Sequence, residues 1–482
     1  MRIRLALLAA LACLAAPAAA QAAGAHPLAT GLVDLHTYSQ GDAVAYARTR
    51  AAGARYVRIL ADWRFIAKQR PARLVNDPAD PADQMYDWSG VDREVRLATQ
   101  HGLQPLLLLY GAPEWAERCR SPDPDHPCDP DPGAFGHFAE AAARRYDGRG
   151  ALPRVRYWQA WNEPNHSFFL SPQYRDGELV SAEMYRALLA SFARGVKSAR
   201  STNVVVAAGL APLARDGVST GPLRFMRALL CMRGRSNPVP ACGARARLDV
   251  WATNPYTAGG PTASAPGPDD VSLGDLPQMT HLLRAAERAG RIVSSTKPVP
   301  FWAAEFGWDS RPPDIGGMPL GLHARWAAEA LYRMWRAGVS TVFWFQLRDE
   351  AGPSQPYGGV YESGLYLNGG DISSDRPKPA LKAFRFPFVA LRTGRGMWLW
   401  GRTPGAAPGR VTIRVRGGGR WRAVGRLEAD RFGVFRAPLR RKRRGRLVRA
   451  EVGGVASQPF SLRYRHNHYA PPFGAARAWM PG

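Results

Sequence analysis

Two glutamates of the chain lie in surroundings that favour chemistry over simple solvation. Glu163 follows an apolar run in Trp161-Asn162-Glu163-Pro164, and Glu305 is embedded in the apolar and aromatic stretch 301–308. A buried glutamate more often forms a structural ion pair. Two carboxyl groups held together, however, can divide acid/base and nucleophilic work between them, as in the cleavage of glycosidic bonds. The rest of the chain must therefore bring the two side chains together.

Both glutamates end predicted strands in a regular alternation of strands and helices. Short apolar runs alternate with amphipathic stretches, as in parallel βα units. The strand runs contain Leu32, Val57, Leu106, Val155, Val204, Leu248, Val299 and Thr341. Eight such units predict a (β/α)8 TIM barrel over residues 27–390. A doubly wound open sheet is the alternative, but no glycine-rich phosphate turn follows the first strand.

The carboxyl ends of the strands form the active-site face of such a barrel. Glu163 ends the fourth strand and Glu305 ends the seventh, so we expect them to face each other across the barrel mouth. Substrate contacts are also expected from polar residues at the ends of strands one and eight: Asp34, His36 and Gln346.

The chain resembles the glycoside hydrolases of clan A, the four-seven superfamily, and is most similar to families five and thirty-nine. The resemblance is carried by Ala112-Pro113-Glu114-Trp115, by Trp161-Asn162-Glu163-Pro164-Asn165 and by Glu305, and it covers residues 31–390. It implies a retaining O-glycosyl hydrolase that cleaves β-linked sugars by double displacement. Glu163 would be the general acid/base, and Glu305 the nucleophile that forms a glycosyl-enzyme intermediate.

The same resemblance implies roles for other polar residues. Asn162 would contact the sugar 2-hydroxyl, and the fixed positive charge of Arg58 would keep Glu305 ionised. Tyr256 would hydrogen-bond the nucleophile. The chain departs from the family pattern two positions before this tyrosine, where Asn254 replaces a frequent histidine. An internal counter-ion of the barrel wall is the alternative role for Arg58.

Three tryptophans are candidates for stacking on sugar rings. The resemblance implies that Trp344, on strand eight, forms the platform under the sugar of the reactive subsite. Trp115 and Trp308 are candidates for the neighbouring subsites. Packing in the core is the alternative for Trp344 and Trp115.

The first residues predict export from the cell. A basic start, an apolar run and small residues form a secretory signal over residues 1–22, and the run is too short to span a bilayer. A lipid anchor at Cys13 is the alternative. No other stretch is long and apolar enough to cross a membrane, so we expect a secreted or cell-surface-associated protein.

The remaining four cysteines fall into two close pairs. Cys119 with Cys128 and Cys231 with Cys242 predict two loop disulfides, as is common in exported proteins. A metal site is the weaker alternative, because neither pair has CxxC spacing or a histidine cluster beside it. We expect neither a metal ion nor a cofactor.

The chain changes character at residue 391. Short alternating runs between Gly/Pro turns predict a small all-β sandwich, immunoglobulin- or fibronectin-like, over 391–465, with a tail at 466–482. From Leu391 onward there are 21 Lys and Arg against 3 Asp and Glu, so +18 of the net charge of +26 lies there. This charge indicates either a solvated arginine-rich face or attachment to an anionic cell-surface polymer. Nucleic acid is a poor fit, since there is no recognition helix or RNA-binding motif.

These observations predict a monomeric, secreted hydrolase of oligo- or polysaccharides. A carbohydrate-binding or cell-surface protein on an inactive barrel is the alternative from another class, and the glutamate pair argues against it. A transglycosylase would use the same residues and would differ only in excluding water from the deglycosylation step.

Overall fold

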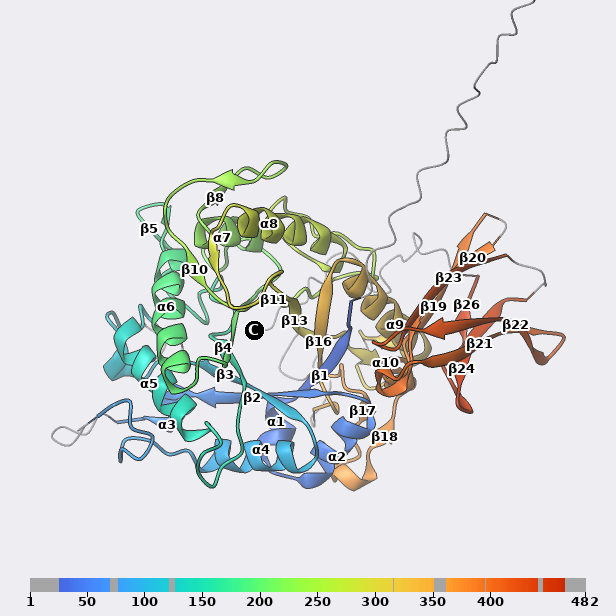
Figure 1. Cartoon of the computed structure of the whole chain (residues 1–482), viewed down its shortest axis with the longest axis horizontal. Helices are drawn as coiled ribbons and strands as arrows, with labels where there is room; N and C mark the ends of the chain where they lie inside the picture. Colours follow the sequence, from blue (N-terminus) through green and yellow to red (C-terminus); the bar gives the residue numbers. More distant parts are fainter. Residues whose placement is uncertain are drawn as a thin grey trace, which may run out of the picture.

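The computed structural model describes residues 26–69, 77–120, 126–314, 316–350, 361–394, 396–440 and 445–463. The predicted signal segment 1–22, Cys13 and the tail 466–482 lie outside these residues. Eight parallel strands close into a barrel, which confirms the predicted architecture (Figure 1). In chain order they are β1 (Ala29–Val33), β2 (Tyr56–Asp62), β3 (Gln104–Tyr110), β4 (Tyr157–Ala160), β7 (Val204–Leu210), β11 (Val250–Thr253), β13 (Phe301–Phe306) and β16 (Val339–Phe345).

Helices follow the strands and surround the barrel (Figure 1). They are α1 (Leu35–Ser39), α2 (Ala43–Ala51), α3 (Trp63–Ile66), α4 (Ser89–Gln100), α5 (Pro132–Arg145), α6 (Ser181–Ala199), α7 (Pro222–Leu229), α8 (Leu276–Arg288), α9 (Leu320–Arg336) and α10 (Pro379–Arg385). Start signals in the sequence explain several boundaries. At α5, the side chain of Asp131 accepts a hydrogen bond of 2.8 Å from the Ala134 backbone N–H, and Pro132 occupies the first helical position.

The loops carry short ladders of two strands each. These are β5 (Tyr174–Arg175) with β6 (Glu178–Leu179), β8 (Met232–Arg233) with β9 (Val239–Pro240), β10 (Ala246–Arg247) with β12 (Ile292–Val293), β14 (Ser310–Arg311) with β15 (Met318–Pro319), and β17 (Tyr366–Leu367) with β18 (Arg376–Pro377). Single 3₁₀ turns occur at Glu114–Ala116, Leu273–Asp275, Ile372–Ser374 and Pro404–Ala406. They add backbone hydrogen bonds to loops that would otherwise have few.

Side chains fill the barrel interior, so it is a packed core and not a channel. The cluster that fills it consists of Val33, Tyr56, Leu106, Val206, Val250, Ala252, Trp302, Ala304 and Phe343. Side chains that point outward from the strands, such as Val57 and Ile59 on β2, belong to a second, larger cluster. This cluster lies outside the barrel and includes residues of the helices. Polar side chains are therefore brought together only toward the carboxyl ends of the strands.

The chain after α10 forms two antiparallel sheets, the predicted sandwich. One sheet has the order β19 (Phe388–Thr393), β20 (Gly396–Arg402), β23 (Val434–Arg440). The other has β22 (Arg420–Ala429), β21 (Gly409–Gly417), β24 (Leu447–Val452) and β25 (Val455–Ala456), and β26 (Phe460–Ser461) also pairs with β24. The division of the chain into domains at residue 391 stays a prediction; β19 spans that position.

The sandwich packs against α9 and lies to one side of the barrel (Figure 1). Trp335 of α9 and Trp400 of β20 have ring centroids 5.7 Å apart. Arg402 donates a hydrogen bond of 3.0 Å to the carbonyl oxygen of Leu28, just before β1. Arg325 of α9 donates one of 2.9 Å to the carbonyl oxygen of Ser461. The barrel and the sandwich are thus joined by apolar and polar contacts.

Two disulfides are present, as predicted. Cys119 is bonded to Cys128 and Cys231 to Cys242, with Cα atoms 5.4 and 5.3 Å apart. In the described part of the chain, no helix combines the length and the apolar character needed to cross a bilayer.

Candidate active site

Glu163 lies in a tight turn directly after β4. Trp161 and Glu163 both have positive φ angles, of 67° and 35°. The turn is held by the Trp161 indole, which donates 2.7 Å to the Phe169 carbonyl oxygen, and by the Glu163 backbone N–H, which donates 3.1 Å to the Gly209 carbonyl oxygen. Such backbone conformations are costly and persist only where the surroundings enforce them. The turn therefore fixes the direction of the Glu163 side chain.

Arg58 of β2 connects the two ends of the site. Its Nη1 forms an ion pair with Oε1 of Glu305 on β13. Its Nη2 donates 2.9 Å to Oδ1 of Asn162, and its Nε donates 2.9 Å to Oε1 of Gln159. Because Arg58 is 1% exposed, water screens its positive charge poorly at the contact with Glu305.

The loop after β11 supplies one donor to each glutamate. Asn254 donates 2.8 Å from Nδ2 to Oε1 of Glu163. The Tyr256 hydroxyl donates 3.2 Å to Oε2 of Glu305. The two carboxyl groups predicted from the sequence are therefore in one constellation, together with Arg58, Asn162 and Tyr256.

The two glutamates differ in their surroundings. The pKa of Glu163 is raised to about 8: burial and then the nearby Glu305 raise it, whereas Asn254 and Arg58 lower it. The side chain of Glu305 keeps 16% exposure and has both Arg58 and Tyr256 as donors. The two carboxyl groups thus differ: the pKa of Glu163 is raised, and Glu305 accepts from two donors. This is the division of roles that acid/base and nucleophilic catalysis need.

Gly209, at the end of β7, leaves the space that these polar groups occupy. Its φ angle is 125°, which favours glycine. A Cβ atom there would lie 2.8 Å from Nε2 of Gln159 and 3.6 Å from Oδ1 of Asn254. A side chain at this position would therefore displace Gln159, which orients Arg58.

The structure corrects the role expected for Trp344. Its indole is fully buried outside the barrel, 5.6 Å from His323 of α9 and 6.3 Å from Phe384 of α10 between ring centroids. The neighbouring Phe345 packs against the interior cluster instead and is half-buried. Phe345 is thus the aromatic residue of β16 that faces the mouth.

Trp308 also has no face free for a ligand. It is 6% exposed, its ring centroid lies 4.7 Å from that of Phe306 and 5.2 Å from that of Trp326, and its Nε1 donates 3.0 Å to the Thr257 carbonyl oxygen. Its expected stacking role is corrected to core packing. Trp115 is half-buried and donates 2.9 Å to the Ala67 carbonyl oxygen, so its subsite role stays a prediction.

The polar residues expected at the ends of strands one and eight differ in their surroundings. His36 is exposed, and its Nε2 lies 2.8 Å from Nε2 of Gln40, so its substrate contact stays a prediction. Asp34 is buried and caps α1 by accepting 2.9 Å from the Thr37 backbone N–H. Gln346 is buried and donates 2.9 Å to the Tyr361 carbonyl oxygen. Asp34 and Gln346 thus have structural partners at the mouth.

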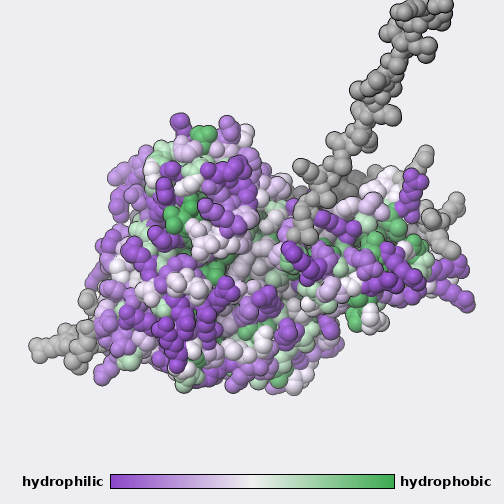
Figure 2. Space-filling model, in the orientation of Figure 1, coloured by the Kyte–Doolittle hydropathy of each residue, from purple (hydrophilic) through white to green (hydrophobic). Residues whose placement is uncertain are grey.

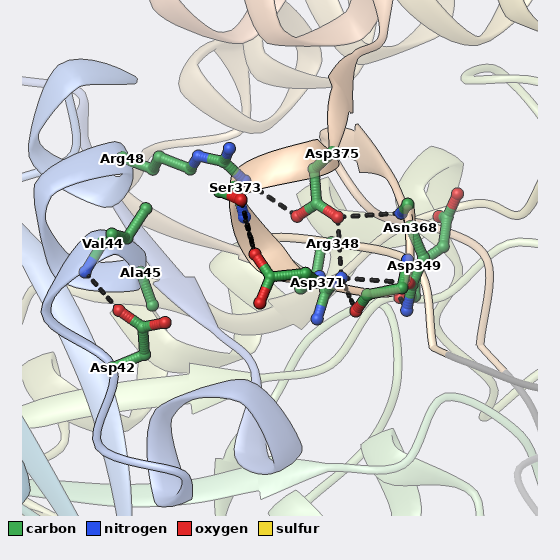
Figure 3. A network of polar contacts seen from close by, with 12 residues as sticks. Asp42, Val44, Ala45, Arg48, Arg348, Asp349, Asn368, Asp371, Ser373 and Asp375 are labelled. Carbon is green, nitrogen blue, oxygen red and sulfur yellow. Dashed lines mark hydrogen bonds and ion pairs between the residues drawn. The ribbon is translucent and has the colours of Figure 1, made fainter.

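A buried polar network holds the segment after β16 (Figure 3). Asp375 accepts 2.8 Å from Arg48 of α2 and 2.7 Å from Arg348. The Arg348 backbone N–H donates 3.2 Å to Asp34, which ties the ends of β16 and β1 together. Burial raises the pKa of the adjacent Asp349 to about 7, although its partner Lys378 lowers it. This network fixes the wall of the mouth that includes Phe345 and Gln346.

Solved structures share this arrangement of barrel and sandwich. A family 39 glycoside hydrolase from the gut symbiont Bacteroides cellulosilyticus WH2 matches with a TM-score of 0.50 and 17% identity, over 86% of this chain and 81% of that chain. The GH39 enzyme from Xanthomonas axonopodis pv. citri matches with a TM-score of 0.50 and 15% identity, over 86% of this chain and 92% of that chain. The chain therefore has the fold of these solved glycoside hydrolases. No protein-family model and no curated protein matches the sequence.

Three residues of the site were not predicted from the sequence. Gln159 orients Arg58, and its signal was a lone amide within the apolar run of β4. Asn254 was noted only as a departure from the family pattern. Tyr361 lies in a loop, with its ring centroid 5.0 Å from that of Phe345. No periodic pattern marks a loop residue of this kind. In the described ranges, no group of three or more His, Cys, Asp or Glu residues is placed to hold a metal ion.

Proposed function

We propose that the protein is an exported, retaining glycoside hydrolase that cleaves β-linked sugars. One observation carries the proposal: a buried Glu163 with a raised pKa shares one site with a Glu305 that is paired with Arg58 and Tyr256. The shared fold of family 39 hydrolases and the disulfides of an exported chain support it.

In the first step, Glu305 attacks the anomeric carbon and Glu163 gives its proton to the departing oxygen. Asn254 donates a hydrogen bond to Oε1 of Glu163. The transferred proton is therefore carried by Oε2, the oxygen that does not accept from Asn254. Formation of the glycosyl ester removes the negative charge of Glu305. The pKa of Glu163 then falls, because that charge had raised it.

In the second step, Glu163 acts as a base. Its lowered pKa lets the carboxylate take a proton from water, which attacks the anomeric carbon and releases Glu305. The two inversions retain the configuration of the sugar. Asn162 precedes Glu163 in the chain and accepts a hydrogen bond from Arg58, the partner of Glu305, and it would bind the 2-hydroxyl group.

Activity on a panel of aryl β-glycosides and β-glycans tests the proposal. Wild type should cleave at least one substrate with the β-anomer as the first product. Glu305→Ala should lose at least about 10⁴-fold in kcat, since the covalent step is gone. With good leaving groups, Glu163→Ala should still form the glycosyl-enzyme but turn over slowly without its base, and azide should restore turnover by forming the β-glycosyl azide. Equal rates in wild type and Glu305→Ala would overturn the assignment.

The same panel separates the alternative functions. A carbohydrate-binding protein on an inactive barrel would bind β-glycans without cleaving any substrate. A transglycosylase would release the aryl group but transfer the sugar to an added acceptor in preference to water. The intact contacts of Glu163 and Glu305 favour hydrolysis over the inactive barrel.

We also propose that the sandwich binds an anionic polysaccharide of the cell surface. The pairing of β21 with β22 and β24 places Arg414, Arg416 and Arg449 on one face with Arg410 and Arg426. Two acids share this face. Glu428 pairs with Arg410, and Glu451 pairs with both Arg414 and Arg449. No ion pair of Arg416 or Arg426 is found among the described residues. Figure 2 shows many hydrophilic residues on the sandwich face in view. The excess of positive charge would attract a polyanion.

Salt-dependent retention on an immobilised carboxylated polysaccharide tests this surface. The double variant Arg416→Ala/Arg426→Ala should elute at lower salt than wild type, because fewer charges contact the polymer. The matched control is Arg96→Ala/Arg175→Ala, two exposed arginines of the barrel domain. Equal shifts in both double variants would show only an effect of net charge and contradict the assigned face.

A further inference from the structure

A pocket of about 430 Å³ lies beside Arg58 and is lined by residues of β2, α1, α3 and α4. Its lining includes Arg58, the partner of Glu305, and Leu60, Asp62 and Phe65. Glu94 of α4 also lines it. This volume falls within the ~300–1,000 Å³ of small-molecule sites. The pocket is therefore large enough for a ligand group beside the reacting sugar.

Glu94 is a buried acid in the wall of this pocket. It is 8% exposed, and no hydrogen bond or ion pair of its carboxyl group is found among the described residues. The other carboxyl groups of the lining have backbone partners: Asp34 accepts from Thr37, Asp62 from Arg64, and Asp87 from Ser89. A buried carboxyl group that lacks a partner costs stability, so a ligand partner would explain its presence.

The protonation of Glu94 suits hydroxyl groups. Burial raises its pKa to about 8, and only the positive charge of Arg93 opposes this shift. Near neutral pH the carboxyl group therefore keeps its proton and can both donate and accept a hydrogen bond. A pair of sugar hydroxyls offers the complementary acceptor and donor.

The rest of the lining favours a neutral sugar ring. Phe65 is 62% exposed and offers a face for stacking at the pocket. Besides the protonated Glu94, three acids, Asp34, Asp62 and Asp87, line the pocket against two cations, Arg58 and Lys68. This excess of acids disfavours an anionic sugar.

We propose that this pocket binds a neutral pyranose unit next to the sugar whose bond is cleaved, with Glu94 hydrogen-bonded to its hydroxyl groups and Phe65 stacked on its ring. The proposal rests on the proposed glycoside hydrolase function. It adds a specificity subsite formed by α3 and α4, and it predicts a preference for substrates with at least two sugar units.

The test compares two aryl β-glycosides that differ by one β-linked sugar at the non-reducing side. The measured quantity is the ratio of kcat/KM for the longer substrate to that for the shorter one. Glu94→Leu should lower this ratio about tenfold, because it removes the hydrogen bonds, and Glu94→Gln should stay within about threefold of wild type. Phe65→Ala, at an exposed position, should lower the ratio about fivefold. The matched control is Glu183→Leu on α6, an exposed glutamate, which should leave the ratio unchanged.

Thermal unfolding distinguishes a ligand role from a structural one. Glu94→Leu should keep or raise Tm, since it removes a buried carboxyl group without a partner. A wild-type ratio in both Glu94→Leu and Phe65→Ala would overturn the subsite alone. A drop in Tm of several degrees in Glu94→Leu with an unchanged ratio would assign Glu94 to structure. If wild type cleaves no glycoside of the panel, the proposed function fails and the subsite fails with it.

Discussion

Asn254 donates a hydrogen bond of 2.8 Å from Nδ2 to Oε1 of Glu163 and so joins the carboxyl ends of β11 and β4. The contact orients a buried acid and stabilises its anion at once. It therefore sets both the position of the proton and the pKa at which the proton is lost.

Asn254→Ala tests this contact. Because the hydrogen bond lowers the pKa of Glu163, its loss should move the basic limb of the pH profile to higher pH. We expect kcat/KM to fall about 10- to 100-fold for poor leaving groups, which need the proton, and much less for dinitrophenyl glycosides. The control is Asn237→Ala, an exposed asparagine. An equal loss of kcat/KM on both substrate classes, with the basic limb of the pH profile at the wild-type pH, would contradict this role of Asn254.

The pH dependence of wild type follows from Glu163. The first step needs the protonated acid, and its pKa is raised to about 8. Glycosylation should therefore be constant below this value and decline as pH rises through it. Single-turnover rates with a poor leaving group, measured from pH 6 to 10, check the sign. A rate that rises through pH 8 would exclude Glu163 as the acid.

Stability should depend on pH in a way that Glu163→Gln removes. A carboxyl group whose pKa rises from 4.5 to about 8 on folding binds its proton more tightly in the folded state. Its contribution to the free energy of unfolding therefore falls as pH rises from about 4.5 to 8. Glutamine does not ionise, so Glu163→Gln should gain more than about 1 kcal/mol over wild type between pH 5 and pH 8. Urea unfolding at both values measures this. If the difference in free energy of unfolding between Glu163→Gln and wild type is the same at both pH values, burial does not raise the pKa of Glu163.

Gly209→Ala should disturb the site by displacing Gln159, which orients Arg58. The new Cβ atom would lie 2.8 Å from Nε2 of Gln159, at a φ angle of 125°. We expect kcat/KM to fall at least about tenfold and Tm to drop by several degrees, because strained positions cost ~1–3 kcal/mol. Gly217→Ala is the control, since Gly217 also has a positive φ angle but no atom near its Cβ position. Similar activity losses in both variants would mean that backbone strain, and not the displacement of Gln159, causes the loss.

Much of the fold and the reacting pair could be predicted from the sequence. Alternation of apolar runs located the barrel strands, and strand ends in a closed barrel must converge, so Glu163 and Glu305 were expected together. The face of a strand on which a single side chain lies could not be predicted as well. Trp344 and Phe345 are adjacent, and a shift of one residue exchanges the two faces of a strand. A register irregularity between Ala303 and Phe306 of β13 adds to this uncertainty. Tyr361 comes from a loop, whose path periodicity does not determine.

The covalent intermediate on Glu305 tests the central claim most directly. A slow, activated 2-deoxy-2-fluoro β-glycoside, of a sugar that wild type cleaves, should trap the glycosyl ester, because deglycosylation is slowed more than its formation. Intact-mass measurement should show one added glycosyl group, and peptide mapping should place it on Glu305. Glu305→Gln should acquire none, and Glu163→Gln should acquire it if the leaving group needs no proton. An adduct on another residue, or turnover of the reagent by Glu305→Gln at the wild-type rate, would contradict the proposed mechanism.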